Sequence, residues 1–275
     1  MLDFSNSKIL IVGDVMLDKY YFGKVDRISP EAPVPIVNIQ KEESRLGGAS
    51  NVANNIVSLG GHSLLCGVIG HDLFGKEIER ISRHKNIDTF LLKTSSPTIT
   101  KARIIGGKQQ IVRVDYEDKS ELNADNKKLF RDTISRILPE YDILVISDYG
   151  KGLISEDLCR YLIKLAHKYD KKVIIDPKGK NWEKYSGADI VTPNVKELSD
   201  IVGYTVPNTD RAIEKAAREA ITNNHLTALL VTRSDKGMSL IGPIPPIHIP
   251  THSEEVFDVS GAGDTVVATL GLCLA

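Results

Sequence analysis

The chain has 275 residues, of which 41% are hydrophobic and 26% are charged. This length and composition allow one large domain with a substantial buried core, and they argue against a disordered chain. The 35 basic and 36 acidic residues leave a formal net charge of −1. Such a balance argues against a dedicated binder of nucleic acid or of an anionic membrane, which normally carries a basic excess.

Cysteine usage and the N-terminus both predict a cytoplasmic protein. Cys66, Cys159 and Cys273 lie far apart among apolar neighbours and form no Cys-x-x-Cys pair. We therefore expect small core residues in a reducing compartment, with no disulfide and no zinc site. The first residues lack the charged and apolar regions of a signal peptide. No apolar run approaches the roughly 20 residues that are required to span a bilayer.

Short apolar runs, taken in chain order, predict the strands of a parallel sheet. They lie at residues 8–13, 63–69, 143–147, 172–176, 189–192 and 228–232. The runs are continuously apolar, which is typical of strands that are covered on both faces. Helical patterns occupy residues 49–59, 155–169 and 209–223. The alternation of strand and helix predicts a doubly wound, mostly parallel α/β fold.

Two segments interrupt this alternation, residues 15–45 and about 97–120. Their period-two patterns, with turns at Gly23, Pro30 and Gly106, predict antiparallel strands. We expect these strands to form a small β-sheet that stands off the α/β core as a lid. The sequence shows no internal repeat, low-complexity tract or Gly/Ser linker, so residues 1–275 are predicted to form a single domain.

The segment at residues 258–265 carries the clearest chemical signal. It reads DVSGAGDT and precedes a helix-compatible run. Gly261 and Gly263 leave backbone amides uncovered where the helix begins, which predicts a local anion site. Asp264 beside such a site suits phosphoryl transfer, because the carboxylate accepts a proton while the amides stabilise the transferring charge. Asp264 could instead be an ordinary helix-stabilising acid, but that interpretation does not explain the two glycines.

Two signatures together resemble the PfkB, or ribokinase-like, family of carbohydrate kinases. One is the segment at 258–265, and the other is LGGASNVA at 46–53. The resemblance extends over essentially the whole chain and implies a ribokinase-like fold with a β-sheet lid, together with ATP and Mg²⁺. It implies that Asp264 is the catalytic base. The residues that it implies for the anion hole are Gly261, Ala262 and Gly263.

The same resemblance implies a nucleotide site. Asn194 and Glu197 match the family's Asn-x-x-Glu, which organises Mg²⁺ and the ATP phosphates largely through water. The other nucleotide contacts that it implies are Lys178, Thr232, Arg233 and Gly237. Each feature also has a purely structural interpretation. Asn194 and Glu197 could form a helix capping box, residues 232–237 an ordinary turn, and Lys178 a solvated surface charge.

On the acceptor side, Asp18 matches the family's aspartate that binds sugar hydroxyls. Asp14 is a second candidate, because it follows the first strand, and ligands bind at the carboxyl ends of such strands. The residues that should line the same pocket are Gly47, Gly48 and Asn51. Met16 stands where ribokinase presents an asparagine to its pentose, which argues against ribose as the substrate.

Stretches at 13–20, 27–35, 113–115 and 147–152 resemble one branch of the family, the heptose 7-phosphate kinases of ADP-heptose and lipopolysaccharide synthesis. The branch implies phosphorylation of D-glycero-β-D-manno-heptose 7-phosphate at the anomeric hydroxyl. The run at 27–35 is equally compatible with a proline-stiffened edge strand. A phosphorylated substrate needs cationic donors. The candidates are Lys101, Arg103, Arg113 and Lys151.

The resemblance also implies a homodimer that pairs through the lid. The chain stops at Ala275, within the helix that follows Asp264, so we expect a kinase domain that is C-terminally incomplete. The family continues with residues that complete the adenine pocket, and many members of the branch add a nucleotidyltransferase domain. Two alternatives remain open, a kinase for another sugar, sugar phosphate or nucleoside, and a non-catalytic regulator. An NAD-binding protein is disfavoured, because no GxGxxG follows the first strand.

Overall fold

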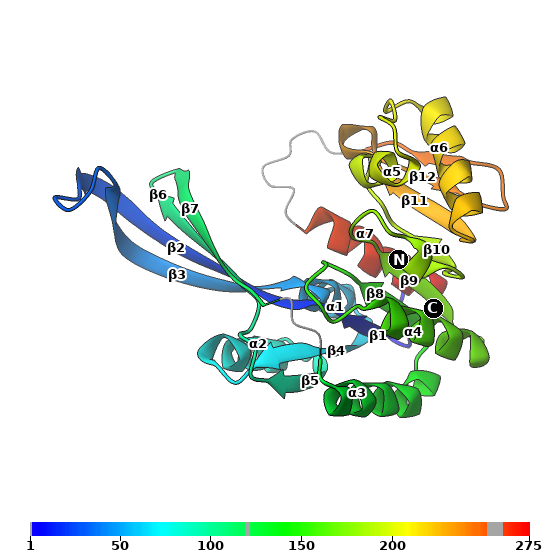
Figure 1. Ribbon diagram of the computed structural model, residues 1–275, viewed down its shortest axis with the longest axis horizontal. Helices are drawn as coiled ribbons and strands as arrows, with labels where there is room; N and C mark the ends of the chain where they lie inside the picture. The colour runs from blue at the N-terminus through cyan, green and yellow to red at the C-terminus, as the bar shows by residue number, and fades with distance from the viewer. Residues whose placement is uncertain (1, 119–121, 252–260) are drawn as a thin grey trace.

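The computed structural model describes residues 2–118, 122–251 and 261–275. Over this part of the chain, a nine-stranded sheet with helices on both faces forms the main body, and a four-stranded sheet projects from it (Figure 1). This arrangement confirms the predicted doubly wound α/β fold with a small β-sheet lid. None of the described helices is long and apolar enough to cross a membrane.

The large sheet has a switch point at its first strand. Its spatial order is β13 (Ile247–Ile249), β12 (Met238–Ile241), β11 (Ala228–Thr232), β10 (Ile190–Val191), β9 (Lys172–Asp176), β8 (Ile143–Ser147), β1 (Lys8–Gly13), β4 (His62–Gly70) and β5 (Asp88–Thr94). The seven neighbouring strands from β5 to β11 are parallel, and β12 runs antiparallel to both β11 and β13. After β1, the chain adds β4 and β5 on one side of this strand, and later β8 to β13 on the other side. Ligands in such sheets bind beyond the carboxyl ends of the strands at this reversal.

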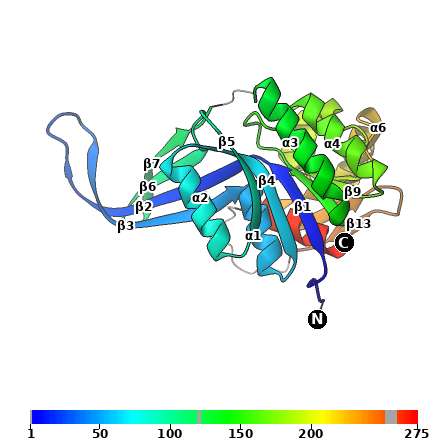
Figure 2. The same cartoon turned by 90° about the horizontal axis from the view of Figure 1, so that it is seen from below.

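Helices cover both faces of the large sheet (Figures 1 and 2). One face carries α1 (Ala49–Ser58), α2 (Leu73–His84) and α7 (Ala262–Leu274). The other carries α3 (Ala124–Ile137), α4 (Glu156–Lys168), α5 (Val195–Val202) and α6 (Asp210–Asn223). Single 3₁₀ turns are η1 (Leu138–Glu140), η2 (Glu183–Tyr185) and η3 (Ser234–Lys236). Alternate residues of β1 enter the two cores, which explains why the strand is apolar throughout.

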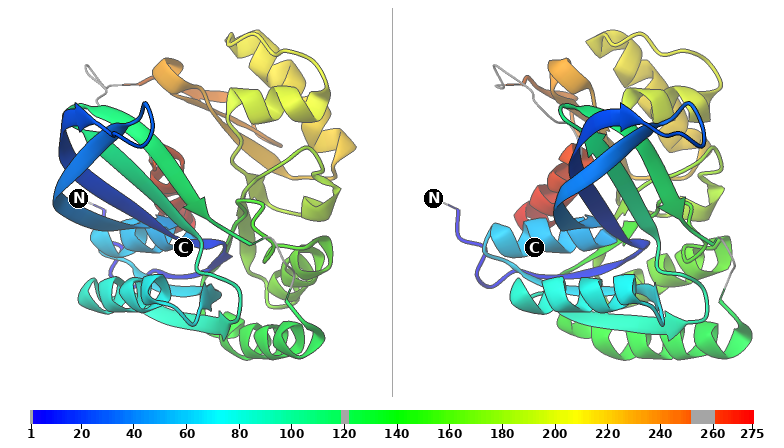
Figure 3. Two further views of the ribbon diagram at one scale, coloured as in Figure 1. Left: turned by 60° about the vertical axis from the view of Figure 1, so that its left-hand side comes forward. Right: turned by 90° about the vertical axis from the view of Figure 1, so that its left-hand side faces the viewer.

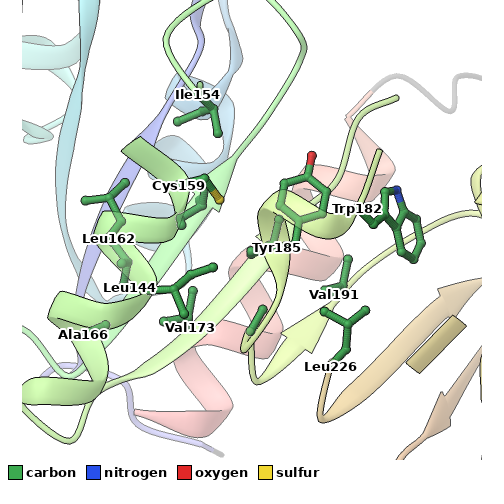
Figure 4. Packing of buried hydrophobic residues seen from close by; sticks show 14 of the residues in the cluster. Leu144, Ile154, Cys159, Leu162, Ala166, Val173, Trp182, Tyr185, Val191 and Leu226 are labelled. Atoms are coloured by element: carbon green, nitrogen blue, oxygen red, sulfur yellow. The ribbon is translucent and has the colours of Figure 1, made fainter. Parts of the chain in front are cut away.

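The core on the α4 face supports the loops that follow β8 and β9. Leu144 and Val173 lie on these neighbouring strands and belong to the same buried cluster as Leu162 of α4 (Figure 4). Trp182 and Tyr185 are fully buried in the same cluster. Each such side chain contributes about 1.5–3 kcal/mol through burial. The loops that leave this edge of the sheet therefore start from a rigid base.

The lid consists of β3 (Pro35–Gly48), β2 (Val15–Ile28), β6 (Thr100–Gly106) and β7 (Gln109–Tyr116), in that spatial order. Its strands extend away from the body and cross in front of it in Figure 3. The pairs β2–β3 and β6–β7 are antiparallel, as predicted, whereas β2 and β6 are parallel. The parallel pair differs from the expectation because both strands begin beside the body, where Leu17 pairs with Thr100, and both run outward.

Candidate active site

Asp264 lies in the first turn of α7, whose N-cap is Gly261. The first N–H groups of a helix have no acceptor within the helix, and they carry the positive end of its dipole. Asp264 is only 4% exposed, whereas Ala262 and Gly263 are exposed. A buried carboxylate thus stands beside two exposed residues of the first helical turn. The earlier part of the predicted motif, residues 258–260, lies outside the described residues.

Two side chains from distant segments hold the carboxylate of Asp264. The amide Nδ2 of Asn51 in α1 donates to Oδ2 over 2.7 Å, and the hydroxyl of Tyr149 donates to Oδ1 over 2.7 Å. Burial raises the pKa of Asp264, while these two hydrogen bonds act in the opposite direction. A raised pKa brings a carboxylate closer to the range in which it accepts a proton at neutral pH.

Gly261 is required by this arrangement. Its φ is 80°, in the left-handed region, and a Cβ atom at this position would lie 2.6 Å from Nδ2 of Asn51. A larger residue would therefore displace Asn51 from Asp264. At Gly263, by contrast, a Cβ atom would meet nothing within 4 Å. The first glycine serves the contact between Asn51 and Asp264, and the second leaves the helix mouth accessible.

A cavity of about 580 Å³ opens in front of Asp264. The lid contributes Asp18, Tyr20 and Arg45 to its lining, and the body contributes Asn51 and Asp264. The cavity therefore lies between lid and body. The structure brings together the predicted base and the predicted sugar-binding Asp18 at one cavity, although they are far apart in the sequence.

Cations gather on the face of the lid that carries Asp18. Nη1 of Arg103 donates to Oδ1 of Asp18 over 2.6 Å. The ring of Tyr20 has two guanidinium groups within cation–π range, that of Arg45 at 4.8 Å and that of Arg103 at 5.1 Å from the centroid. Lys101 lies over the ring of Tyr149 at 5.7 Å, and burial lowers its pKa. We call Arg45, Lys101 and Arg103 the lid cations.

Arg45 was not among the residues predicted from the sequence. Its position becomes evident only from the strand register, which pairs Asp18 with Arg45 on one side and with Lys101 on the other. Residues that pair directly across neighbouring strands share one face of the sheet. Arg113 of β7 also faces a charged neighbour, but its guanidinium is paired with Asp115 over 2.8 Å on the exposed edge strand.

Gly47 and Gly48, the predicted Gly-Gly turn, affect the shape of the cavity through the residues that they contact. A Cβ atom at Gly47 would collide with the carboxylate of Asp18, and one at Gly48 would lie 2.6 Å from the backbone oxygen of Asp14. Both glycines therefore allow the bases of β2 and β3 to approach closely. In this way they place Asp18 at the mouth of the cavity.

Asp14 and Lys151 lie at a different place from Asp18. Oδ2 of Asp14 accepts hydrogen bonds from the backbone N–H groups of Tyr149 and Lys151, over 2.8 and 3.0 Å. Burial raises the pKa of Asp14 to about 6. Lys151 forms an ion pair with Glu117. Asp14 and Lys151 line a second cavity, of about 560 Å³. Asp14 therefore anchors the loop that carries Tyr149, and it lines this second cavity and not the cavity of Asp264.

The predicted nucleotide residues meet beyond the ends of β9 and β10. Asn194 caps α5 and forms a capping box with Glu197, so the structural interpretation of this pair is confirmed. The other oxygen of Glu197 accepts a hydrogen bond from Nζ of Lys178 over 3.1 Å. Asn194 also forms a parallel bridge with Thr232 at the end of β11. One carboxylate beside one lysine fits a Mg²⁺ ion that keeps most of its waters and bridges to phosphates.

Arg233 and Gly237 make close contacts within the protein itself. The buried guanidinium of Arg233 donates to Asn208 over 2.9 Å, to Asp210 over 2.6 Å and to Ser239 over 2.9 Å. It ties the loop after β11 to the start of α6, so the guanidinium that was predicted to contact the nucleotide is occupied by partners within the protein. A Cβ atom at Gly237 would collide with the backbone oxygen of Ile249. Asn194, Thr232 and Arg233 border a hollow of about 710 Å³.

Asp176 connects the two halves of the site. It ends β9, and its pKa is raised well above the ordinary value by burial and by the charges of Asp264 and Glu197. The predicted base and the predicted nucleotide carboxylate therefore both lie within electrostatic reach of Asp176. Neither Asp176 nor Tyr149 was predicted as a site residue. Both stand at or just beyond a strand end, which was the available signal.

The chain matches the model of the pfkB family of carbohydrate kinases over residues 6–275, and it belongs to this family. It is 46% identical over 275 residues to the bifunctional protein HldE of Haemophilus influenzae (strain PittEE), with 99% of this chain and 56% of that protein covered. It is 44% identical over 275 residues to the bifunctional protein HldE of Vibrio vulnificus (strain YJ016), with the same coverage. The chain thus spans little more than half the length of these curated relatives.

Solved structures with the same fold include other sugar kinases. The tetrameric inhibited form of phosphofructokinase-2 from Escherichia coli superposes with a TM-score of 0.79 at 20% identity, covering 98% of this chain and 87% of that one. Arabidopsis thaliana ribokinase, complexed with ribose and ATP, gives 0.74 at 20% identity, with coverages of 98% and 86%. These likenesses confirm the predicted ribokinase-like fold.

Proposed function

We propose that the protein is a cytoplasmic ATP-dependent kinase that phosphorylates D-glycero-β-D-manno-heptose 7-phosphate at its anomeric hydroxyl. The products would be the 1,7-bisphosphate and ADP, in the synthesis of ADP-heptose for lipopolysaccharide. The observation that carries the proposal is the carboxylate of Asp264, held by two donors beside a helix N-terminus at a cavity that Asp18 and Arg45 of the lid border. The choice of heptose rests on the resemblance of the sequence to one branch of the family.

In this reaction, Asp18 and Asp264 act on the sugar. Asp18 orients a sugar hydroxyl, and Asp264 accepts the proton of the anomeric hydroxyl as its oxygen attacks the γ-phosphoryl group of ATP. The N–H groups of Ala262 and Gly263 stabilise the charge on the transferring group. Lys178 and Glu197 hold the nucleotide phosphates, Glu197 through water. Mg²⁺, when bound, neutralises the charge of those phosphates.

The lid cations are proposed to bind the 7-phosphate of the substrate. Arginine forks match phosphate geometry, and the guanidinium groups of Arg45 and Arg103 lie within 5.1 Å of the centroid of the Tyr20 ring. A phosphate between lid and body would draw the lid inward. Such closure excludes water and so limits wasteful hydrolysis of ATP.

Two protomers are proposed to pair through the lid. Large apolar side chains are exposed there, among them Ile28 at 61%, Val34 at 51% and Val112 at 45%. Val112 and Val114 follow each other on one face of the edge strand β7. Exposed apolar surface on a projecting sheet is typical of an interface.

A coupled ADP-release assay with the full-length protein tests the substrate. The panel contains heptose 7-phosphate, the unphosphorylated heptose, fructose 6-phosphate, ribose and adenosine. We expect kcat/KM for heptose 7-phosphate to exceed that for the unphosphorylated heptose by about 100-fold, because hydrogen bonds to charged groups contribute about 1.5–3 kcal/mol each. Arg45→Met should reduce this ratio by about tenfold. Arg83→Met, an exposed arginine of α2, is the matched control and should leave it unchanged. Preference for an unphosphorylated sugar would remove the heptose phosphate proposal.

A further inference from the structure

Tyr149 contacts the proposed base, but the proposed reaction gives this residue no role. Its hydroxyl donates to Oδ1 of Asp264, while Asn51 occupies Oδ2. Among the described residues, each carboxylate oxygen therefore has one side-chain donor, and rotation about the Cβ–Cγ bond would break both hydrogen bonds. Both donors are far from Asp264 in the sequence: Asn51 is 213 residues away, and Tyr149 is 115 residues away.

The position of Tyr149 is fixed independently of Asp264. Its backbone N–H donates to the buried Asp14 over 2.8 Å. The preceding residue, Asp148, is buried, and it accepts hydrogen bonds from the hydroxyl of Tyr185 over 2.7 Å and from the N–H of Gly150 over 2.8 Å. The loop after β8 is thus anchored on both sides of Tyr149. A phenol on such a support is preorganised to orient its acceptor.

We propose that Tyr149 is a positioning residue, whose hydroxyl donates to Asp264 and holds it, together with Asn51, in the orientation that accepts the proton of the sugar. The inference rests on the proposed role of Asp264 as the base. In the reaction the proton passes from the attacking hydroxyl to Asp264, and Tyr149 keeps its own proton. Burial and the charge of Asp264 raise the pKa of Tyr149, so the phenol remains a donor throughout.

The groups around Asp264 determine in which direction loss of the Tyr149 hydroxyl would shift the pKa of Asp264. Burial raises the pKa of Asp264, and Asn51 and Tyr149 lower it through hydrogen bonds. Among the charged groups, Asp18 of β2 raises this pKa, and Lys101 of β6 lowers it. Asp176 of β9 also interacts with Asp264, as one carboxylate with another. Loss of the phenol removes one of the two hydrogen bonds that favour the ionised base, so the pKa of Asp264 must rise.

Tyr149→Phe in the full-length protein tests the inference. We expect kcat at neutral pH to fall by about tenfold, while KM for ATP changes by less than about twofold. The acidic limb of the plot of kcat/KM against pH should move to higher pH by about one unit. Tyr204→Phe is the matched control, because its hydroxyl bonds Glu219 on the exposed surface. It should leave both the rate and the pH profile unchanged.

A second variant and a second readout keep the test independent of folding and of substrate. Replacement of Tyr149 by 3-fluorotyrosine retains the ring and strengthens the donor, so it should move the acidic limb in the opposite direction. The titration of Asp264 can be followed directly by carboxyl ¹³C NMR, with Asp264→Asn as the assignment standard. If no sugar is phosphorylated, the proposed function fails, but the NMR titration still tests the role of Tyr149. An unchanged titration of Asp264 in Tyr149→Phe would overturn the inference and leave the kinase proposal intact.

Discussion

Two aspartates in this protein are almost equally buried but have different partners. Asp14 is 2% exposed and accepts hydrogen bonds from backbone N–H groups. Asp264 is 4% exposed, but its donors are side chains, and it lines the cavity between lid and body, whereas Asp14 lines the second cavity. The backbone donors of Asp14 belong to the loop after β8, whereas the side-chain donors of Asp264 hold its carboxylate at the cavity between lid and body. The partners of these two aspartates, more than their burial, distinguish the anchor of a loop from the proposed base.

Asp14 makes a testable contribution to stability. Burial raises its pKa from the ordinary 3.8 to about 6 in the folded protein. The folded state therefore binds a proton where the unfolded state does not, so this contribution to stability is fully present below pH 3.8 and is lost as the pH rises through about 6. A difference of about two units corresponds to about 3 kcal/mol.

Asp14→Asn should remove this pH dependence, because the amide oxygen can accept the same backbone hydrogen bonds without a charge. In urea unfolding, we expect the free energy of unfolding of Asp14→Asn, relative to that of the parent, to rise by about 3 kcal/mol between about pH 4 and pH 8. Asp132→Asn, at an exposed position of α3, serves as the control. A difference between Asp14→Asn and the parent that stays constant with pH would contradict the assignment.

At the scale of elements, the sequence predicts best those segments that are buried on both faces. All six predicted strands and all three predicted helices are confirmed, because their apolar residues enter two cores or one continuous stripe. Strands β5, β12 and β13 were missed, since each is only partly buried. Helices α2, α3 and α5 were also missed, because few of their apolar side chains are buried: Ile78 and Ile81 in α2, Phe130 and Ile134 in α3, and Leu198 in α5. The parallel pairing of β2 and β6 could not be predicted. A period-two pattern indicates which residues share a face of the strand, but it does not indicate whether two strands run parallel or antiparallel.

The lid dimer gives a prediction for β7. Val112 is 45% exposed on this edge strand, and a stable interface buries about 1,200–2,000 Å² in total. Val112→Glu places a charge in the proposed apolar interface. We expect the parent to sediment as a dimer at micromolar concentrations and Val112→Glu to sediment as a monomer. Leu129→Glu, at a 48% exposed position of α3, is the control and should remain dimeric. A Val112→Glu protein that remains dimeric would contradict pairing through the lid.

For the molecule as a whole, the site depends on contacts between distant parts of the chain. The residues that form local motifs, such as Asp264 and Asn51, could be predicted from the sequence alone. For Tyr149 and Asp176 the sequence offered only their places at strand ends, and for Arg45 it offered no signal. Their proximity arises when the switch point at β1 brings strand ends together beside the lid. The sequence also could not show that Asn51 contacts the base across 213 residues.

The central claim is that Asp264 accepts the proton of the acceptor hydroxyl. Asp264→Asn keeps the shape of the side chain, and its single amide oxygen can still accept one of the two hydrogen bonds that Asn51 and Tyr149 donate, but it cannot take up that proton. In the full-length protein, kcat for heptose 7-phosphate should fall by on the order of 100-fold or more. The dissociation constants of ATP and of the sugar, measured by calorimetry, should change by less than about threefold, a shift of under 1 kcal/mol. Turnover of Asp264→Asn within about tenfold of the parent would contradict the claim.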